Sequence, residues 1–300
     1  MGIMQVVKTL AQDDPRLHVL TDEELKALQK ALFGMVKDIA ETCEKHHILW
    51  CLSGGSALGA VRHKGFIPWD DDMDIFMMRE DFEKFKKVFP KEMSDKYYLR
   101  CPGDKGYLYH FPRIYKKGTR ARSIQSNDVP YGISIDFFLM ENTYDNGMKR
   151  KFHGAESTFY LMVDSLLRID ACKKTMLEYG GKSAELRKAV KLRSTLSVFF
   201  KFRSLEKWLA SSDKCFSKVK TAGRYLVVPS GAKHFFGEIY DREKMYPPSD
   251  AEFCGMTVKV PHDVDYYLKS RYGNDYMTPP PADKQEKHVF VEFNLFGDHV

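Results

Sequence analysis

Apolar side chains recur at three- and four-residue steps between residues 25 and 43, which is the spacing of one helix face. The segment Thr21-Asp22-Glu23-Glu24 has the form of a capping box, with a hydroxyl first and a carboxylate three positions later. Short apolar runs at residues 48–52 and 75–78 predict two strands. A glycine turn and the helix-compatible residues 57–62 lie between them, so the pattern predicts a strand, a turn, a helix and a second strand.

Beyond this unit, the pattern predicts a second packed helix and three strands rich in aromatic and β-branched residues. The helix covers residues 79–88 and ends before Pro90, and the strands cover 97–99, 107–115 (broken at Pro112) and 133–139. Asp136 lies in the last of these strands, in an otherwise apolar setting. Aspartate is a poor strand former, so its presence in this strand needs a reason.

The rest of the chain divides by its composition. Residues 149–220 are helical and basic in pattern, whereas strands and turns are predicted over 223–260, a short helix closed by Gly273 over 263–272, and a last strand over 289–293. We therefore expect an N-terminal arm (1–20), a catalytic core (21–145), a basic helical region (146–222) and a C-terminal region (223–300) that completes the site.

The overall composition is that of a globular protein, with 43% apolar and 29% charged residues among 300. No segment approaches the roughly 18 apolar residues of a membrane-spanning helix. Residues 1–20 show no secretory leader, so we expect a cytoplasmic protein. The six scattered cysteines form no C-x-x-C pair, which argues against both a zinc site and a disulfide framework.

The net charge of +6 is concentrated in one segment. Residues 182–220 contain eleven Lys or Arg and three Asp or Glu, interleaved with apolar residues such as Leu192, Leu196 and Phe199. Two interpretations stay open: a solvated helix whose apolar side packs on the domain, or a peripheral contact with the inner face of an anionic membrane. Nucleic acid is the weaker partner, because the segment has no recognisable nucleic-acid-binding motif.

Asp72 and Asp74 are the first candidates for chemistry, because they are two positions apart on a predicted strand and therefore share a face. Carboxylates this close repel each other unless a cation binds between them, and all-oxygen ligation suits Mg²⁺, with Mn²⁺ as a substitute. Asp136 supplies a third ligand if its strand is a neighbour. Mg²⁺ commonly takes its remaining oxygens from substrate phosphates, so the pattern predicts a phosphate-bearing substrate.

Gly54, Gly55 and Ser56 supply the other half of the predicted site. Glycines let a ligand approach the backbone closely, and the N–H groups at the start of the next helix favour an anion. We expect a diphosphate to bind there. A Gly-Gly-Ser turn or an acidic cluster alone is weak evidence, but the two together on consecutive strands are far more specific.

Three groups of residues carry a family resemblance. They are Leu52-Ser53-Gly54-Gly55-Ser56-Ala57-Leu58-Gly59 with Arg62 and Ile67-Pro68-Trp69-Asp70-Asp71-Asp72-Met73-Asp74-Ile75; Ile135-Asp136-Phe137-Phe138; and Tyr267-Leu268, Tyr272-Gly273-Asn274-Asp275-Tyr276-Met277, Pro279-Pro280 and His288. Together they resemble the LicD family of phosphotransferases, which includes the fukutin-related proteins. The resemblance spans roughly residues 25 to 290, and the basic helical region is its least characteristic part.

The resemblance implies an α+β fold: a nucleotidyltransferase-like mixed β-sheet core flanked by helices, with a basic helical insertion and a C-terminal α/β extension. It also implies an enzyme that moves a phospho-substituent, such as phosphocholine, from a CDP-linked donor to a hydroxyl of a cell-surface glycan or a teichoic-acid precursor, free or lipid-linked. Carried over by position, the implied Mg²⁺ ligands are Asp72, Asp74 and Asp136, with Asp70 in or beside their shell, and the implied donor-phosphate residues are Gly54, Gly55 and Ser56.

Phosphoryl transfer needs charge neutralisation and positioning more than covalent help, so nearby cations matter. Arg62, Arg113 and Lys116 are the candidates for donor binding, each weighed against a solvated surface charge. The acceptor hydroxyl would lose its proton to a carboxylate with a raised pKa, Asp136 or Asp70. His288 is a further donor-site candidate, weighed against a structural histidine.

Two alternative functions use the same residues differently. A nucleotidyltransferase would attack the α-phosphate of a nucleoside triphosphate and release pyrophosphate, whereas a CDP-donor transferase releases CMP. A non-catalytic basic binding protein would be expected to have lost an acid from the cluster, and all of the acids are present.

Overall fold

The computed structural model describes residues 14–126, 132–181, 183–281, 285 and 288–296, so most of the expected N-terminal arm lies outside the described residues. The first described helix, α2 (Asp22–Lys45), begins where the capping box predicts. Thr21 Oγ1 accepts a hydrogen bond from the Glu24 N–H at 3.2 Å, and the Glu24 carboxylate accepts one from the Thr21 N–H at 2.8 Å. The predicted apolar stripe of α2 is buried, which confirms this element.

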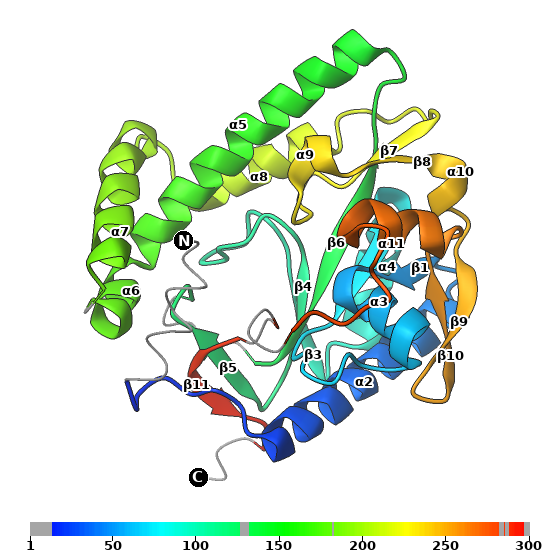
Figure 1. Ribbon diagram of the computed structural model, residues 1–300. Coiled ribbons are helices and arrows are strands. Elements are labelled where there is room, and N and C mark those ends of the chain that lie inside the picture. The colour runs from blue at the N-terminus through cyan, green and yellow to red at the C-terminus, as the bar shows by residue number, and fades with distance from the viewer. Residues whose placement is uncertain (1–13, 127–131, 182, 282–284, 286–287, 297–300) are drawn as a thin grey trace.

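A mixed sheet forms the centre of the molecule, with the strand order β1-β2-β6-β4-β3 and with β7 and β8 continuing from β6 (Figure 1). β2 and β6 are parallel, and the other neighbouring pairs are antiparallel. The strands are β1 (Trp50–Leu52), β2 (Asp74–Met78), β3 (Tyr97–Arg100), β4 (Arg113–Lys116), β6 (Ser134–Asn142), β7 (Tyr225–Val227) and β8 (Ile239–Asp241). The expected fold class, a mixed sheet flanked by helices, is confirmed.

The two faces of the central strands have different roles. Phe137 of β6 packs against Phe82 and Phe85 of α4 (Arg79–Glu92), with ring centroids 5.9 and 5.6 Å apart. Because side chains alternate along a strand, the neighbouring Asp136 points to the opposite face. One face of β6 therefore builds the hydrophobic core, and the other carries the acid.

A layer of helices lies beside the sheet and corresponds to the expected basic helical region (Figure 1). Its elements are α5 (Gly147–Ala171), α6 (Lys173–Gly180), α7 (Ala184–Ser197), the 3₁₀ turn η1 (Val198–Phe200) and α8 (Leu205–Phe216). In the part of the chain that the structure describes, no helix is long and apolar enough to cross a membrane.

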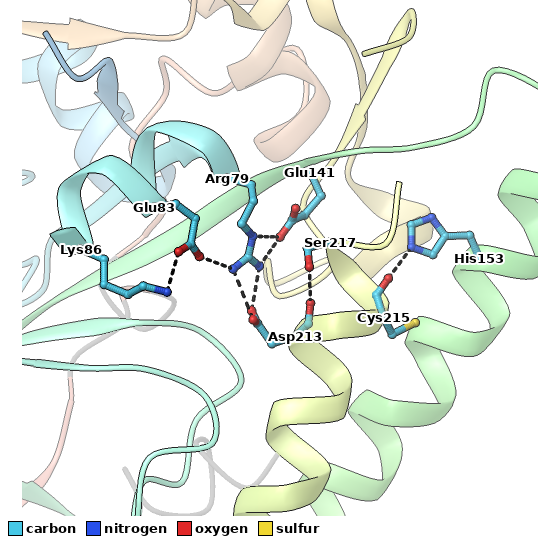
Figure 2. Close-up of polar contacts among 8 residues, drawn as sticks. All are labelled: Arg79, Glu83, Lys86, Glu141, His153, Asp213, Cys215 and Ser217. Carbon is cyan, nitrogen blue, oxygen red and sulfur yellow. Dashed lines mark hydrogen bonds and ion pairs between the residues drawn. The ribbon is translucent and has the colours of Figure 1, made fainter. Parts of the chain in front are cut away.

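An ion-pair network attaches this layer to the central sheet and to α4 (Figure 2). Arg79, at the start of α4, pairs with the buried carboxylate of Glu141 in β6 and with Asp213 of α8, to which its Nη2 donates at 2.7 Å. Arg79 therefore connects three elements that are far apart in the sequence. Within the helical layer itself, the Nε2 atom of His153 in α5 lies 2.9 Å from the Cys215 carbonyl oxygen of α8.

The C-terminal region folds back on the core. It contains α9 (His234–Gly237), α10 (Arg242–Met245), the β9 (Ser249–Phe253) and β10 (Met256–Val260) hairpin, α11 (Val264–Tyr272) and β11 (Phe290–Asn294). The Asp263 side chain caps α11 by accepting a hydrogen bond from the Tyr266 N–H at 3.0 Å, and Gly273 follows the helix with a φ of 98°. The predicted short helix closed by Gly273 is confirmed.

Three details of the predicted elements are wrong. α4 does not end before Pro90 but continues to Glu92, held by the buried Phe89 side chain and by the Met93 N–H that donates to the Phe89 carbonyl. Residues 107–112 are not a strand, because the rings of Tyr107 and Tyr109 pack into a cluster with α5, α6 and α7 instead.

The third error concerns the acid pair. β2 begins at Asp74, so Asp72 precedes the strand and does not lie on it. One strand was not predicted at all: β5 (Arg120–Ser123), which pairs antiparallel with β11.

Candidate active site

Asp74 and Asp136 lie directly opposite each other at the start of the β2 and β6 pairing. Paired residues on neighbouring parallel strands present their side chains to the same face of the sheet. That face is opposite the one on which Phe137 packs against α4. The structure therefore brings together two of the predicted acids from segments 62 residues apart.

Asp70 and Asp72 complete the cluster from the segment that leads into β2. Burial raises the pKa of Asp74 well above its usual range, and the carboxylates of Asp72, Asp136 and Asp70 raise it further, while Arg113 opposes them. Repulsion of this kind requires carboxylates that are close together. Burial and the acid cluster therefore raise the pKa of Asp74, and Asp136 and Asp70, the two candidates for the general base, lie beside it.

Arg113 of β4 binds Asp136 through two nitrogen atoms of its guanidinium group. Nε and Nη2 each donate a hydrogen bond to one oxygen of the Asp136 carboxylate. Its guanidinium carbon also lies 4.2 Å from the centroid of the Tyr109 ring. The pair is mostly buried, with 17% of the Arg113 side chain and 18% of the Asp136 side chain exposed. Arg113 was predicted as a donor-binding cation, and the structure places it beside the acids rather than beside the glycine turn.

The glycine turn lies against the same acids. Gly54 and Gly55 form the first turn of α3 (Gly54–His63), and Gly54 has a φ of 51°. A Cβ atom at Gly54 would be 2.9 Å from an Asp74 carboxylate oxygen, and one at Gly55 would be 2.7 Å from an oxygen of Asp70. Residues without side chains are therefore required for the helix start to approach the acid cluster this closely.

Two hydroxyl groups fix this arrangement. The Ser56 hydroxyl accepts a hydrogen bond from the Asp74 N–H at 3.0 Å, and the buried Tyr267 hydroxyl accepts one from the Gly54 N–H at 2.8 Å. Ser56 was predicted to hold donor phosphates, but in this structure its side chain positions Asp74. Tyr267 belongs to α11, so the C-terminal region supports the Gly54 turn directly.

His288 lies beside the acid cluster and binds the carboxylate of Asp71. Its backbone N–H donates to Asp71 Oδ2 at 2.8 Å, and its Nδ1 atom lies 2.5 Å from Asp71 Oδ1. Burial opposes a charge on the imidazole, but Asp71, Asp72 and Asp70 outweigh it and raise the pKa of His288 to about 10. The histidine is therefore a cation bound to the acid run at neutral pH.

A cavity of about 240 Å³ opens beside the acids. Asp72, Asp136 and Arg113 line it, together with Tyr109, Gln125 and Phe290. The cavity combines charged groups with aromatic and polar ones, as small-molecule sites commonly do.

The two other predicted cations lie in different places. The Arg62 Nη1 donates to the Tyr276 carbonyl oxygen at 2.9 Å, so this side chain connects α3 with the C-terminal region. Lys116 lies on the opposite face of β4 from Arg113 and Tyr115, with its ammonium 5.5 Å from the centroid of the Tyr97 ring. The structure does not bring Lys116 to the acid cluster.

The acids fit a divalent cation in charge and in donor chemistry, because carboxylate oxygens suit Mg²⁺ and a cation would relieve the repulsion around Asp74. Within the described ranges, however, no three His, Cys, Asp or Glu side chains are already arranged as a metal site. Asp136 contacts Arg113 with both oxygens. Each carboxylate oxygen has a second lone pair, so these contacts leave Asp136 able to bind a metal ion, but the predicted ligand set of Asp72, Asp74 and Asp136 requires the three side chains to rearrange around it.

A mixed sheet with acids at the ends of adjacent strands, facing a glycine turn at a helix start, defines a nucleotidyltransferase-like core. In sequence, residues 47–161 match the LicD/FKTN/FKRP nucleotidyltransferase domain family. Residues 47–161 therefore form a LicD family domain, as the motifs in the sequence indicate, and the expectation of an enzyme of the LicD type is confirmed at the level of this domain.

Individual relatives agree with this assignment. The lipopolysaccharide cholinephosphotransferase LicD of Haemophilus influenzae is 28% identical over 258 residues, which cover 83% of this chain and 90% of the relative. Two uncharacterised proteins match shorter segments. The one from Rickettsia typhi is 44% identical over 68 residues, 23% of this chain and 21% of the relative. The one from Rickettsia prowazekii is 37% identical over 78 residues, 24% of this chain and 29% of the relative.

Sequence reasoning missed the structural roles of three residues near the site. Asp71 binds His288, and Tyr267 binds the Gly54 N–H. Burial raises the pKa of Tyr272, and the charges of the nearby Asp74, Asp70 and Asp72 raise it further. The two tyrosines belong to the C-terminal motif, which was the available signal. Only the folded chain shows that this motif lies against the glycine turn.

Proposed function

We propose that the protein is a Mg²⁺-dependent transferase that moves a phospho-substituent, phosphocholine or a similar group, from a CDP-linked donor to a hydroxyl of a cell-surface glycan. The observation that carries the proposal is the pairing of Asp74 with Asp136 across β2 and β6, directly beside the Gly54 turn. A cation held by acids next to a helix start is the arrangement that a diphosphate donor needs.

The bond changes define what the site must do. An acceptor oxygen attacks the phosphorus of the transferred phospho-substituent, the bond from this phosphorus to the bridging oxygen of CMP breaks, and CMP leaves with the electron pair. Mg²⁺ bound to Asp72, Asp74 and Asp136 would neutralise charge on the transferring phosphate. The N–H groups of the first turn of α3 would bind the donor phosphates.

The remaining polar groups position the donor and move the proton. Arg113 holds Asp136 and adds positive charge to the lining of the cavity. The acceptor proton needs a carboxylate that is not a metal ligand, and Asp70, which faces Gly55, is the candidate base.

The acceptor is proposed from the relative's name and from the chemistry. The Haemophilus influenzae relative is named for lipopolysaccharide, so a lipopolysaccharide saccharide is the first acceptor to test. A teichoic-acid precursor is the second, because the same acid cluster can activate a sugar or an alditol hydroxyl.

A product assay tests the proposal. The protein is incubated with CDP-choline, Mg²⁺ and an oligosaccharide acceptor, and the nucleotide products are resolved by chromatography. CMP formation that depends on the acceptor supports the proposal. Pyrophosphate release from a nucleoside triphosphate would support a nucleotidyltransferase instead. No turnover of a panel of CDP-conjugates and nucleoside triphosphates would favour a non-catalytic binding protein.

A further inference from the structure

Part of the helical region exposes large apolar side chains to solvent. Leu192 and Leu196 of α7, Phe199 of η1, Phe202 in the turn that follows, and Phe159 of α5 form what we call the α7–η1 surface. Their exposed fractions are 62, 41, 73, 79 and 45%. Single exposed apolar residues are common, but several together indicate an interaction site.

These residues belong to one patch. Leu192, Leu196 and Phe199 follow each other at steps of four and three residues, which places them along one side of the helix and its 3₁₀ extension. Phe159 and Phe202 both contact the ring of Trp208, with centroid distances of 6.4 and 5.8 Å. Trp208 therefore links the exposed ring of α5 to the exposed ring of the turn.

The patch is not the face that α7 uses to pack on the protein. Leu186 and Val190 lie on the other side of α7, where they are buried in a cluster with Tyr107 and Tyr109. Burial therefore explains only part of the apolar pattern of residues 182–220, and the exposed part needs a different partner.

The positive charge around the patch favours an anionic partner. Residues 182–220 contain eleven basic and three acidic residues. Two of these acids are engaged within the protein, since Asp213 accepts from Arg79 and Glu206 accepts from the Gly106 N–H. Lys188 and Lys191 are exposed on α7 itself. Lys201 and Lys218 pair with Asp170 and Glu156, so the charge available to a partner comes from the other basic residues, Lys188 and Lys191 among them.

We propose that the α7–η1 surface docks on an anionic membrane, with Phe199 and Phe202 inserted among the lipid headgroups and the lysines bound to lipid phosphates. Exposed aromatic and aliphatic side chains beside lysines are the composition of interfacial membrane contacts. A second copy of the chain fits less well, because a two-fold contact would bring the same basic segments together.

Docking here has a consequence for the site, although the inference does not depend on the transferase activity. Tyr109 lines the cavity beside the acids and packs against the buried side of α7. The membrane surface would then be separated from the cavity wall by the thickness of one helix, about 10 Å. A lipid-linked acceptor would be close to the acid cluster.

Vesicle co-sedimentation of the full chain tests the proposal. We expect binding to vesicles containing phosphatidylglycerol, weakened by salt, and no binding to pure phosphatidylcholine vesicles. The double variant Phe199→Ser with Phe202→Ser should bind about tenfold more weakly or worse, because it loses two inserted rings. The matched control is Tyr98→Ser, which changes a 56% exposed ring on β3 and should bind like the parent.

A charge variant tests the contribution of the lysines to vesicle binding separately from that of the phenylalanines. Lys188→Glu with Lys191→Glu should weaken binding to anionic vesicles while the phenylalanines remain. Equal binding by all variants, equal binding to neutral and anionic vesicles, or no vesicle binding would overturn the proposal. So would a dimer in lipid-free solution, measured by light scattering, that Phe199→Ser with Phe202→Ser dissociates, because the surface would then be a protein interface.

Discussion

Asp74 of β2 and Asp136 of β6 face each other as register partners across two parallel strands, and the next pair along, Ile75 and Phe137, is fully buried on the opposite face. A shift of one residue in the register would move an acid into the core, so the hydrophobic packing fixes the position of the acids. The hydrophobic packing of the core therefore keeps Asp74 and Asp136 in register on the opposite face of the sheet.

Replacing Asp74 with Asn should lower activity and raise stability. The carboxylate is lost from the proposed metal site, so we expect a fall in kcat/KM of at least about 100-fold. Because burial and neighbouring acids raise the pKa of Asp74, an uncharged side chain relieves repulsion at neutral pH. Thermal unfolding without divalent cations and the CMP assay measure the two effects. Asp250→Asn, at an exposed acid on β9, is the control and should change neither.

Gly55→Ala should impair the site because its Cβ would lie 2.7 Å from an Asp70 oxygen. We expect a loss of transferase activity with an increase in the KM for the donor, because the acid must move away from the turn. Gly34→Ala is the matched control, since nothing lies within 4 Å of the added Cβ in the middle of α2. It should gain roughly 0.5–1 kcal/mol of stability and keep full activity. Equal activity of both variants would contradict the proposed close approach.

Tyr267→Phe should cost both stability and activity, because the buried Gly54 N–H loses its hydrogen-bond acceptor. Leaving such a group unsatisfied costs about 1–3 kcal/mol. Tyr97→Phe also removes a hydroxyl bond, to Asp38 at 2.7 Å, but far from the acids. Chemical denaturation should show a loss for both variants, and initial rates should fall only for Tyr267→Phe. A parallel fall in rate for both would mean that the effect is general destabilisation.

The stability of the protein should depend on pH through Asp164 of α5. Burial raises the pKa of this carboxyl to about 7, and its Oδ1 atom is buried without a hydrogen-bond partner among the described residues. The unfolded carboxyl ionises near pH 4, so its contribution to stability falls as the pH rises from about 4 to about 7 and is constant above. Asp164→Asn should therefore gain stability over the parent with rising pH, by a few kcal/mol at about pH 8. Denaturation curves at several pH values check this, and a gain independent of pH would contradict it.

Local signals in the sequence predicted much of the fold. The capping box at Thr21 placed the start of α2, and Asp263 with Gly273 bounded α11. The apolar runs on each side of the Gly54 turn predicted β1 and β2, because short buried strands and glycine turns depend on neighbouring residues only.

The parts that sequence did not predict depend on contacts between distant segments. The pairing of β5 with β11 joins residues about 170 positions apart and leaves no local pattern. The partner of Arg113 depends on the register of β4 with β6, and the direction of Lys116 depends on which face of β4 is buried. The Ser56 hydroxyl turned out to bind the backbone of β2, a contact that exists only after α3 has packed on that strand.

The most direct test of the account is Mn²⁺ binding, measured by electron paramagnetic resonance of the free ion in the parent chain and in Asp74→Asn, Asp136→Asn and Asp250→Asn. The account predicts one bound ion per parent chain, binding weakened about tenfold or more in the first two variants, and unchanged binding in the third. Equal Mn²⁺ affinity in the parent and in Asp136→Asn would show that the two acids do not share a cation and would contradict the account.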